Sequence, residues 1–279
     1  MLHTIRTRQA VRFLLGLVDD EDTAERVRTR TGLSGSDDPS ELRGARLSAW
    51  FTGTAPVSLL LWVLEEDDPE LNTLVWRHPR ADEFFRRAIA RGVPFGAGRT
   101  APVAVEARLR GSEPPVPEAY TRYGLAGALA EGTSMAVARR AASMVLTADD
   151  WAEAARADAA GPLPGYTRWA LAVRPDCPPA LRARFGDHPK FTHRVRRAGV
   201  LAGPASYATG WEPAGQVLSV LTLGAELFPR RVGEAEDALR PLVRDHLGDR
   251  EEAWAVLAQV VDTFHGTVPE LMITSGALA

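Results

Sequence analysis

A gapless internal repeat constrains the fold of this chain more than any other sequence feature. Residues 57–98 match residues 167–208 at a constant offset of 110. The matching positions include Leu61 with Leu171, Pro69 with Pro179, His78-Pro79 with His188-Pro189, and Arg86-Arg87-Ala88 with Arg196-Arg197-Ala198. Because the match needs no insertion or deletion, it predicts that 57–92 and 167–202 superimpose as equivalent folding units.

The residue pattern inside each copy predicts three helices. An apolar helix, 57–64 or 167–173, ends at an acidic turn that contains proline. Proline suits the first turn of the second helix, where its missing N–H costs no hydrogen bond. His-Pro ends that helix, and Asp82 or Thr192 is expected to cap a third. Gly92 or Gly203 is expected to end the third helix as its C-cap.

Apolar residues at helical spacing predict further helices along the chain. Thr147, followed by two aspartates, is a typical helix start, as is Thr267 before Pro269 and Glu270. The predicted segments are 135–146, 151–157, 216–227, 234–247, 251–264 and a short terminal helix.

Proline and glycine indicate where the helical segments are interrupted. Residues 94–117 are rich in proline and are predicted to form a linker, while 31–40 read as an exposed loop. The resulting division places N-terminal helical repeats in 1–93 and C-terminal repeats in 118–279. We expect the two parts to form one continuous elongated domain.

One segment resembles a known repeat family. Residues 170–185, continued by Asp187-His188-Pro189 and by 195–198, resemble a leucine-rich-repeat-variant unit, which is related in style to HEAT repeats. The resemblance implies an all-α fold, an α-solenoid of degenerate helical repeats that is interrupted near 94–117. This family motif is a packing pattern, so it implies partner binding and carries no active site.

Charge and composition limit the classes of partner. Lys and Arg total 33 against 36 Asp and Glu, and a net charge of −3 is too near neutral for the whole molecule to act as a polyanion binder. Lys190 is the only lysine. Enrichment in Arg, Ala and Gly is typical of a bacterial genome rich in G and C, and it also leaves room for a local basic face.

Cysteine usage and hydropathy predict a reducing, aqueous compartment, the cytoplasm. Cys177 is the only cysteine, which excludes an intramolecular disulfide and a cysteine-based zinc site. The apolar stretch 11–18 is broken by Arg12 and followed by an acidic run, unlike a signal peptide. No window approaches the roughly 18 apolar residues that span a bilayer, so no membrane insertion is expected.

No catalytic or cofactor motif stands out. The phosphate-binding loop, the nucleophile elbow and the His-Glu-x-x-His pattern are all missing. Asp187, His188 and His193 form only a weak metal candidate because of their irregular spacing. His78 and His188 occupy equivalent repeat positions and are expected to cap helices. We therefore expect no cofactor and no metal, although a dispersed active site stays open.

Paired arginines give the sharpest functional hint. The pairs lie at similar points of three predicted helices, where they could form a ladder that faces carboxylates or phosphates, and a further arginine precedes the last pair. Adjacent helical residues point about 100° apart, so at most one of each pair can face a given partner. The competing interpretation is a solvated surface paired to acidic residues. The residues concerned are Arg86, Arg87, Arg139, Arg140, Arg194, Arg196 and Arg197.

Tryptophans divide into core and surface candidates. Trp62, Trp169 and Trp254 lie on apolar helix faces and are expected in the core. Trp76 and Trp211 have more polar neighbours and are candidates for an exposed contact. The sequence therefore favours a non-catalytic scaffold that binds another protein through arginine and aromatic anchors. The alternative is a nucleic-acid-binding solenoid with an arginine-lined face, and the oligomeric state is left open.

Overall fold

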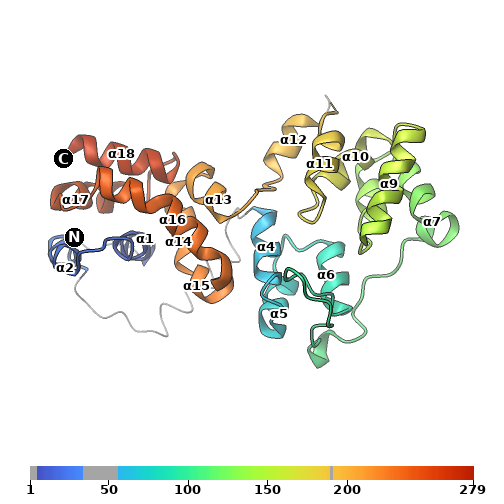
Figure 1. Ribbon diagram of the computed structural model, residues 1–279, viewed down its shortest axis with the longest axis horizontal. Coiled ribbons are helices and arrows are strands. Elements are labelled where there is room, and N and C mark those ends of the chain that lie inside the picture. Colours follow the sequence, from blue (N-terminus) through green and yellow to red (C-terminus); the bar gives the residue numbers. More distant parts are fainter. Residues whose placement is uncertain (1–4, 34–55, 189–190) are drawn as a thin grey trace. The chain divides into compact units, whose positions relative to one another are not determined.

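The computed structural model describes residues 5–33, 56–188 and 191–279, and every regular element in these ranges is a helix (Figure 1). The predicted all-α class is thereby confirmed. Contacts within the chain define two compact units, one of Met1–Thr54 with Leu201–Ala279 and the other of Ala55–Val200. The predicted linker 94–117 lies inside the second unit, and most of the predicted loop 31–40 lies outside the described residues.

The second unit contains the first copy of the repeat and the second copy as far as Val200. Its buried side chains form a core that includes Leu129, Trp151, Trp169 and Phe185. The elements in chain order are α4 (Val57–Leu64), α5 (Pro69–Arg77), α6 (Glu83–Ala90), the 3-10 turn η1 (Ala107–Leu109), α7 (Glu118–Ala130), α8 (Met135–Ala141), α9 (Ala148–Ala160), α10 (Gly165–Ala172), α11 (Pro179–Gly186) and α12 (Thr192–Arg197).

Helices α4, α5 and α6 correspond to α10, α11 and α12 at the offset of 110. Pro69 and Pro179 each stand in the first turn of their helix, as expected from their missing N–H. Gly92 follows α6 with a φ of 64°, which is the predicted left-handed ending. The correspondence of helix positions agrees with the repeat, while the superposition of the two copies stays a prediction.

The second copy departs from the expected helix ends. Its third helix begins at Thr192 itself, and no side chain caps it. That helix ends before Gly199, whose φ is 72°, so the prediction of Gly203 as the C-cap was wrong. Gly203 instead precedes α13 as its N-cap, with extended backbone. A glycine four positions earlier supplies the left-handed residue, and the helix is correspondingly shorter.

Local capping fixes the start of α9. The Thr147 hydroxyl accepts from the N–H of Asp150, and the Asp150 carboxylate accepts from the N–H of Thr147 at 2.8 Å, which together form a capping box. The preceding helix, predicted to continue to residue 146, ends at Ala141. The five residues between Ala141 and Thr147 form a turn whose carbonyls accept hydrogen bonds from two arginine side chains.

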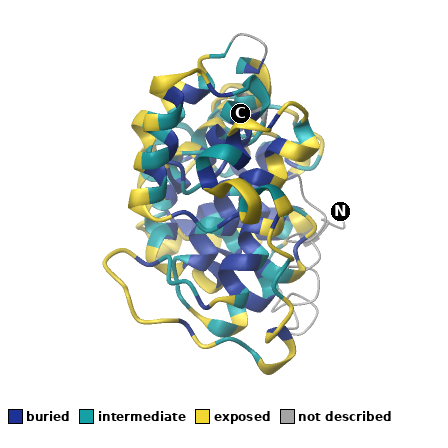
Figure 2. Cartoon of the chain, turned by 90° about the vertical axis from the view of Figure 1, so that its right-hand side faces the viewer, coloured by how far each residue is buried: buried dark blue, intermediate teal, exposed yellow. Residues whose placement is uncertain are grey.

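The described part of the first unit contains α1 (Ile5–Leu15), α2 (Glu21–Thr31), α13 (Pro204–Gly210), α14 (Ala214–Thr222), α15 (Gly224–Leu227), α16 (Pro229–His246), α17 (Glu251–Val260) and α18 (Val268–Leu278). Helix α1 packs on α14, α13 on α16, and α17 on both α2 and α18. Trp254 is fully buried, as predicted. In Figure 2, which turns the second unit toward the viewer, buried stretches lie on the inner sides of the helices and exposed stretches on their outer sides. Thr267 caps α18 with a second capping box.

The C-terminal helices α14 to α18 lie where helical spacing predicted them, but their first and last residues differ. The predicted helix 216–227 is two helices, α14 and α15. Helix α16 begins at Pro229, ahead of the predicted residue 234, because proline suits a first turn. Within the described residues, no helix combines the length and the apolar character required to cross a membrane.

We predict that Thr147→Ala destabilises the protein by about 1 kcal/mol, because the N–H of Asp150 in the first turn of α9 loses its acceptor. Thr147→Ser keeps the hydroxyl and should retain nearly all the stability. Urea unfolding followed by circular dichroism measures the difference. Equal midpoints for the alanine and serine variants would show that the capping box does not stabilise α9.

Candidate functional site

Arg87 lies in the core of the second unit and does not reach the surface. Its side chain is 0% exposed. Its Nε donates to the carbonyl of Ser143 at 3.3 Å, and its Nη1 donates to Glu113 at 2.8 Å. Its Nη1 and Nη2 also donate to the carbonyls of Pro114 and Pro115. The predicted role of Arg87 in binding a partner is therefore corrected to a structural one.

The Arg87 contacts also order the end of the proline-rich segment. Glu113 accepts from Arg91 as well as from Arg87. The hydrogen bond from Arg91 lowers the pKa of Glu113, burial opposes it, and the hydrogen bond from Arg87 adds to the lowering. Residues 113–115 are thus held against α6, and this part of 94–117 is packed structure, unlike a free linker.

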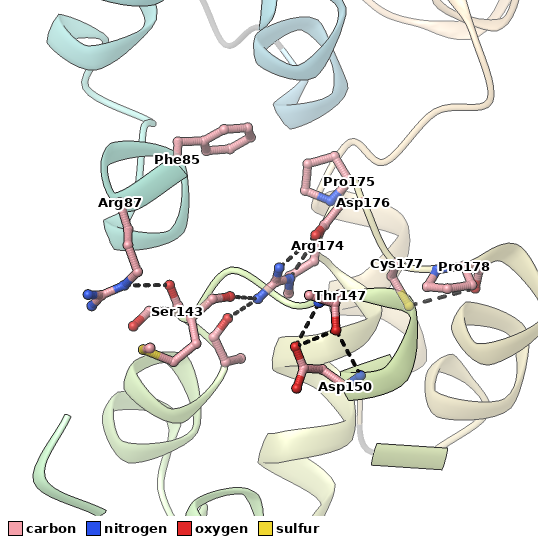
Figure 3. A network of polar contacts seen from close by, with 12 residues as sticks. Phe85, Arg87, Ser143, Thr147, Asp150, Arg174, Pro175, Asp176, Cys177 and Pro178 are labelled. Carbon is pink, nitrogen blue, oxygen red and sulfur yellow. Dashed lines mark hydrogen bonds and ion pairs between the residues drawn. The ribbon is translucent and has the colours of Figure 1, made fainter. Parts of the chain in front are cut away.

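Arg174, at the end of α10, is a second buried arginine in the same region. Its Nη1 donates to the carbonyls of Ala142 and Met144, and its Nε and Nη2 form a fork with Asp176 at 2.9 and 2.6 Å. Its guanidinium lies 4.0 Å from the ring centre of Phe84. Figure 3 shows Arg87 and Arg174 on either side of Ser143. Sequence reasoning did not single out Arg174.

The exposed arginines of α8 and α12 are connected through two aromatic rings. The Arg139 guanidinium lies 4.9 Å from the Trp169 ring, and the Arg194 guanidinium lies 5.9 Å from the Phe191 ring. The centres of the two rings are 6.3 Å apart. We call Arg139, Trp169, Phe191 and Arg194 the arginine–aromatic row. Two predicted site residues, one from each helix, are thereby linked through a continuous chain of aromatic contacts.

Neither arginine of the row forms an ion pair with a carboxylate in the described part of the chain, and the same holds for the exposed Arg140. The neighbouring Arg168 and Arg184 differ, because both pair with the buried Asp158. Burial alone would raise the pKa of Asp158, but the hydrogen bond from Arg168 and the charge of Arg184 lower it overall. The row therefore keeps positive charge that the described protein does not neutralise.

The local sequence is strongly basic around the row. Residues 165–200 contain eight arginine and lysine residues against two aspartates, a net charge of +6. Part of this charge is compensated, since Arg168, Arg174 and Arg184 each pair with an aspartate. The uncompensated part leaves this segment with an excess of positive charge.

Three further predicted site residues, Arg86, Trp76 and Trp211, lie on other elements than those of the row. Arg86 and Trp76 are half-buried on α6 and α5. Trp211 lies in the first unit beside Tyr207, with ring centres 6.4 Å apart. Arg196 and Arg197 belong to α12, and their side chains lie outside the described residues. Arg87 is used in the core, which leaves only Arg86 of that pair for a ladder, and the ladder itself stays a prediction.

The histidines and acidic residues offer no metal centre in the described ranges, where no group of three or more potential ligands converges. His78 is buried at the C-cap position of α5, and its Nδ1 accepts from the N–H of Arg80 in the turn that follows. The His188 ring instead packs against the Phe191 ring of the row, with the two ring centres 5.3 Å apart.

A surface pocket in the second unit is lined by Asp67 and Arg99. The Asp67 carboxylate already accepts from the N–H groups of Phe95 and Gly96.

Comparisons with protein-family models, with curated proteins and with solved structures gave no match. The assignment of a site therefore rests on the geometry of the chain itself. In the second unit, that geometry separates buried arginines, which hold the fold, from the exposed arginines of the row.

We predict that Arg87→Ala lowers the free energy of unfolding by about 3 kcal/mol, because the carbonyls it serves and the partly buried Glu113 lose a charged partner. Arg86→Ala is the matched control on the same helix and should stay within about 0.5 kcal/mol of the wild type. Denaturant unfolding of both variants tests the assignment. Similar losses for the two alanines would contradict it.

The buried Cys177 thiol can report on local unfolding of the second unit. Its thiol is 2% exposed, and burial raises its pKa to about 12, so the reactive thiolate is nearly unpopulated at neutral pH. We predict that a thiol reagent such as Ellman's reagent labels Cys177 slowly in the native protein and rapidly in denaturant. Immediate stoichiometric labelling without denaturant would show that the thiol is accessible.

Proposed function

We propose that this chain is a non-catalytic helical-repeat scaffold that binds another protein through the arginine–aromatic row. The observation that carries the proposal is the link from Arg139 through Trp169 and Phe191 to Arg194, with no carboxylate partner for either arginine among the described residues. Arginine and aromatic side chains contribute disproportionately to protein interfaces.

The rings hold the arginines ready for a partner. A flexible arginine loses rotamer entropy when a partner immobilises it, and a ring already in contact with the guanidinium reduces that loss. The N–H groups lie at the edge of the guanidinium plane, so a ring over its face leaves them free to donate. The row therefore combines charge, fixed geometry and free donors.

The architecture supports a scaffold. Helices α4 to α6 and α10 to α12 occur at corresponding sequence positions, and we assign them to the leucine-rich-repeat-variant and HEAT-like style of repeat. Units of this style bury their apolar faces only against neighbours, which creates large surfaces for binding. We further place the protein in a reducing bacterial cytoplasm, a location with which its single buried cysteine is compatible.

Nucleic acid is the second candidate partner, favoured by the net charge of +6 in residues 165–200. Two observations weigh against it. The whole chain carries −3, and the unit outside Ala55–Val200 carries 13 arginines against 19 acidic residues, a net charge of −6. A long polyanion gains little from a chain whose net charge is negative, whereas a protein partner need carry only a few charges.

The proposal predicts a set of bound proteins that depends on the row. Immobilised wild-type protein, the double variant Arg139→Glu/Arg194→Glu and the control Arg156→Glu would each be exposed to extract of the source organism. Arg156 is exposed on α9 and has no ion pair in the described structure. Its substitution therefore changes the charge as each substitution in the row does, but at a position outside the row. Quantitative mass spectrometry should find proteins that wild type and control retain and the double variant loses. Identical sets for all three folded proteins would refute the proposal.

A further inference from the structure

We infer that the partner presents a short acidic segment, whose carboxylates bind Arg139 and Arg194. This inference rests on the proposed function and names the chemistry of the partner. A carboxylate matches the forked N–H groups of a guanidinium in a bidentate pair. The protein uses this pairing internally, where Arg174 forks Asp176 through two hydrogen bonds of 2.9 and 2.6 Å.

The spacing of the row suits an extended peptide. Steps of 4.9, 6.3 and 5.9 Å lead from the guanidinium of Arg139 across the two rings to that of Arg194. An extended chain advances about 3.3 Å per residue and turns alternate side chains to the same side. The three steps set an upper limit of about 17 Å on the distance between the two guanidinium groups, and an extended segment of about six residues can span that distance.

The burial of the rings argues against stacked bases. Proteins that bind single-stranded nucleic acid present open aromatic faces on which bases stack. Trp169 is only 6% exposed and Phe191 only 2%, and each carries an arginine over its ring. These rings position guanidinium groups and offer no platform for a base.

The test uses a fluorescent peptide of alternating glutamate and serine, with a matched peptide in which glutamine replaces every glutamate. Fluorescence anisotropy should show that the glutamate peptide binds the wild-type protein and that the glutamine peptide binds about tenfold more weakly or not at all. Raising the salt concentration should weaken binding, since exposed charges are screened.

The variants locate the binding site. Arg139→Gln and Arg194→Gln should each weaken binding of the glutamate peptide by about tenfold, whereas Arg156→Gln should leave it unchanged. Arg139→Lys should give an intermediate affinity, because lysine keeps the charge and loses the fork. Circular dichroism checks that every variant is folded.

Four results would overturn the inference. The first two are a glutamate peptide that does not bind and one that binds equally well after both arginine substitutions. A single-stranded oligonucleotide that binds more tightly than the peptide, and depends on the same arginines, would assign the row to nucleic acid. If the extract experiment still finds proteins that depend on the row, and the acidic peptide does not displace them, the proposed function stands and the acidic segment is refuted.

Discussion

The turn between α8 and α9 is the point on which the second unit depends. A helix ends with carbonyl groups that lack partners inside the helix, and burying them without a donor is costly. Here the carbonyls of Ala142, Ser143 and Met144 accept from Arg174 and Arg87. The negative end of the α8 dipole adds to the attraction. Because one arginine comes from α6 and the other from the end of α10, this turn joins both copies of the repeat.

The two copies share a pattern of helices but differ in how each fills its core. At the offset of 110, Arg174 corresponds to Leu64, which is fully buried. The position is buried in both copies, yet one holds an aliphatic side chain and the other a charged one whose hydrogen bonds are satisfied. Repeats of this kind can therefore keep their helices while individual core positions take up new polar contacts.

Sequence reasoning succeeded where the determining interaction is local. Caps at Asp82, Thr147 and Thr267 depend on residues within one helical turn, and all three form. The burial of Arg87 instead involves Ser143, which lies 56 residues away in the sequence. No local sequence pattern contains that contact. The geometric argument that adjacent arginines point about 100° apart was sound, since Arg86 is half-buried and Arg87 is buried. It could not tell which of the two would face inward.

The arginines of the row were predicted as site residues from the sequence, but the aromatic rings that connect them were not. Trp169 was expected in the core, and it is buried there, yet its core position is what supports Arg139 at the surface. A residue can thus belong to the packing and to the binding surface together. Replacing Trp169 would change stability and binding at once, because both the core and the arginine lose the ring. The exposed arginines separate the two effects, since their removal leaves the core intact, and binding changes at those positions therefore report on the surface alone.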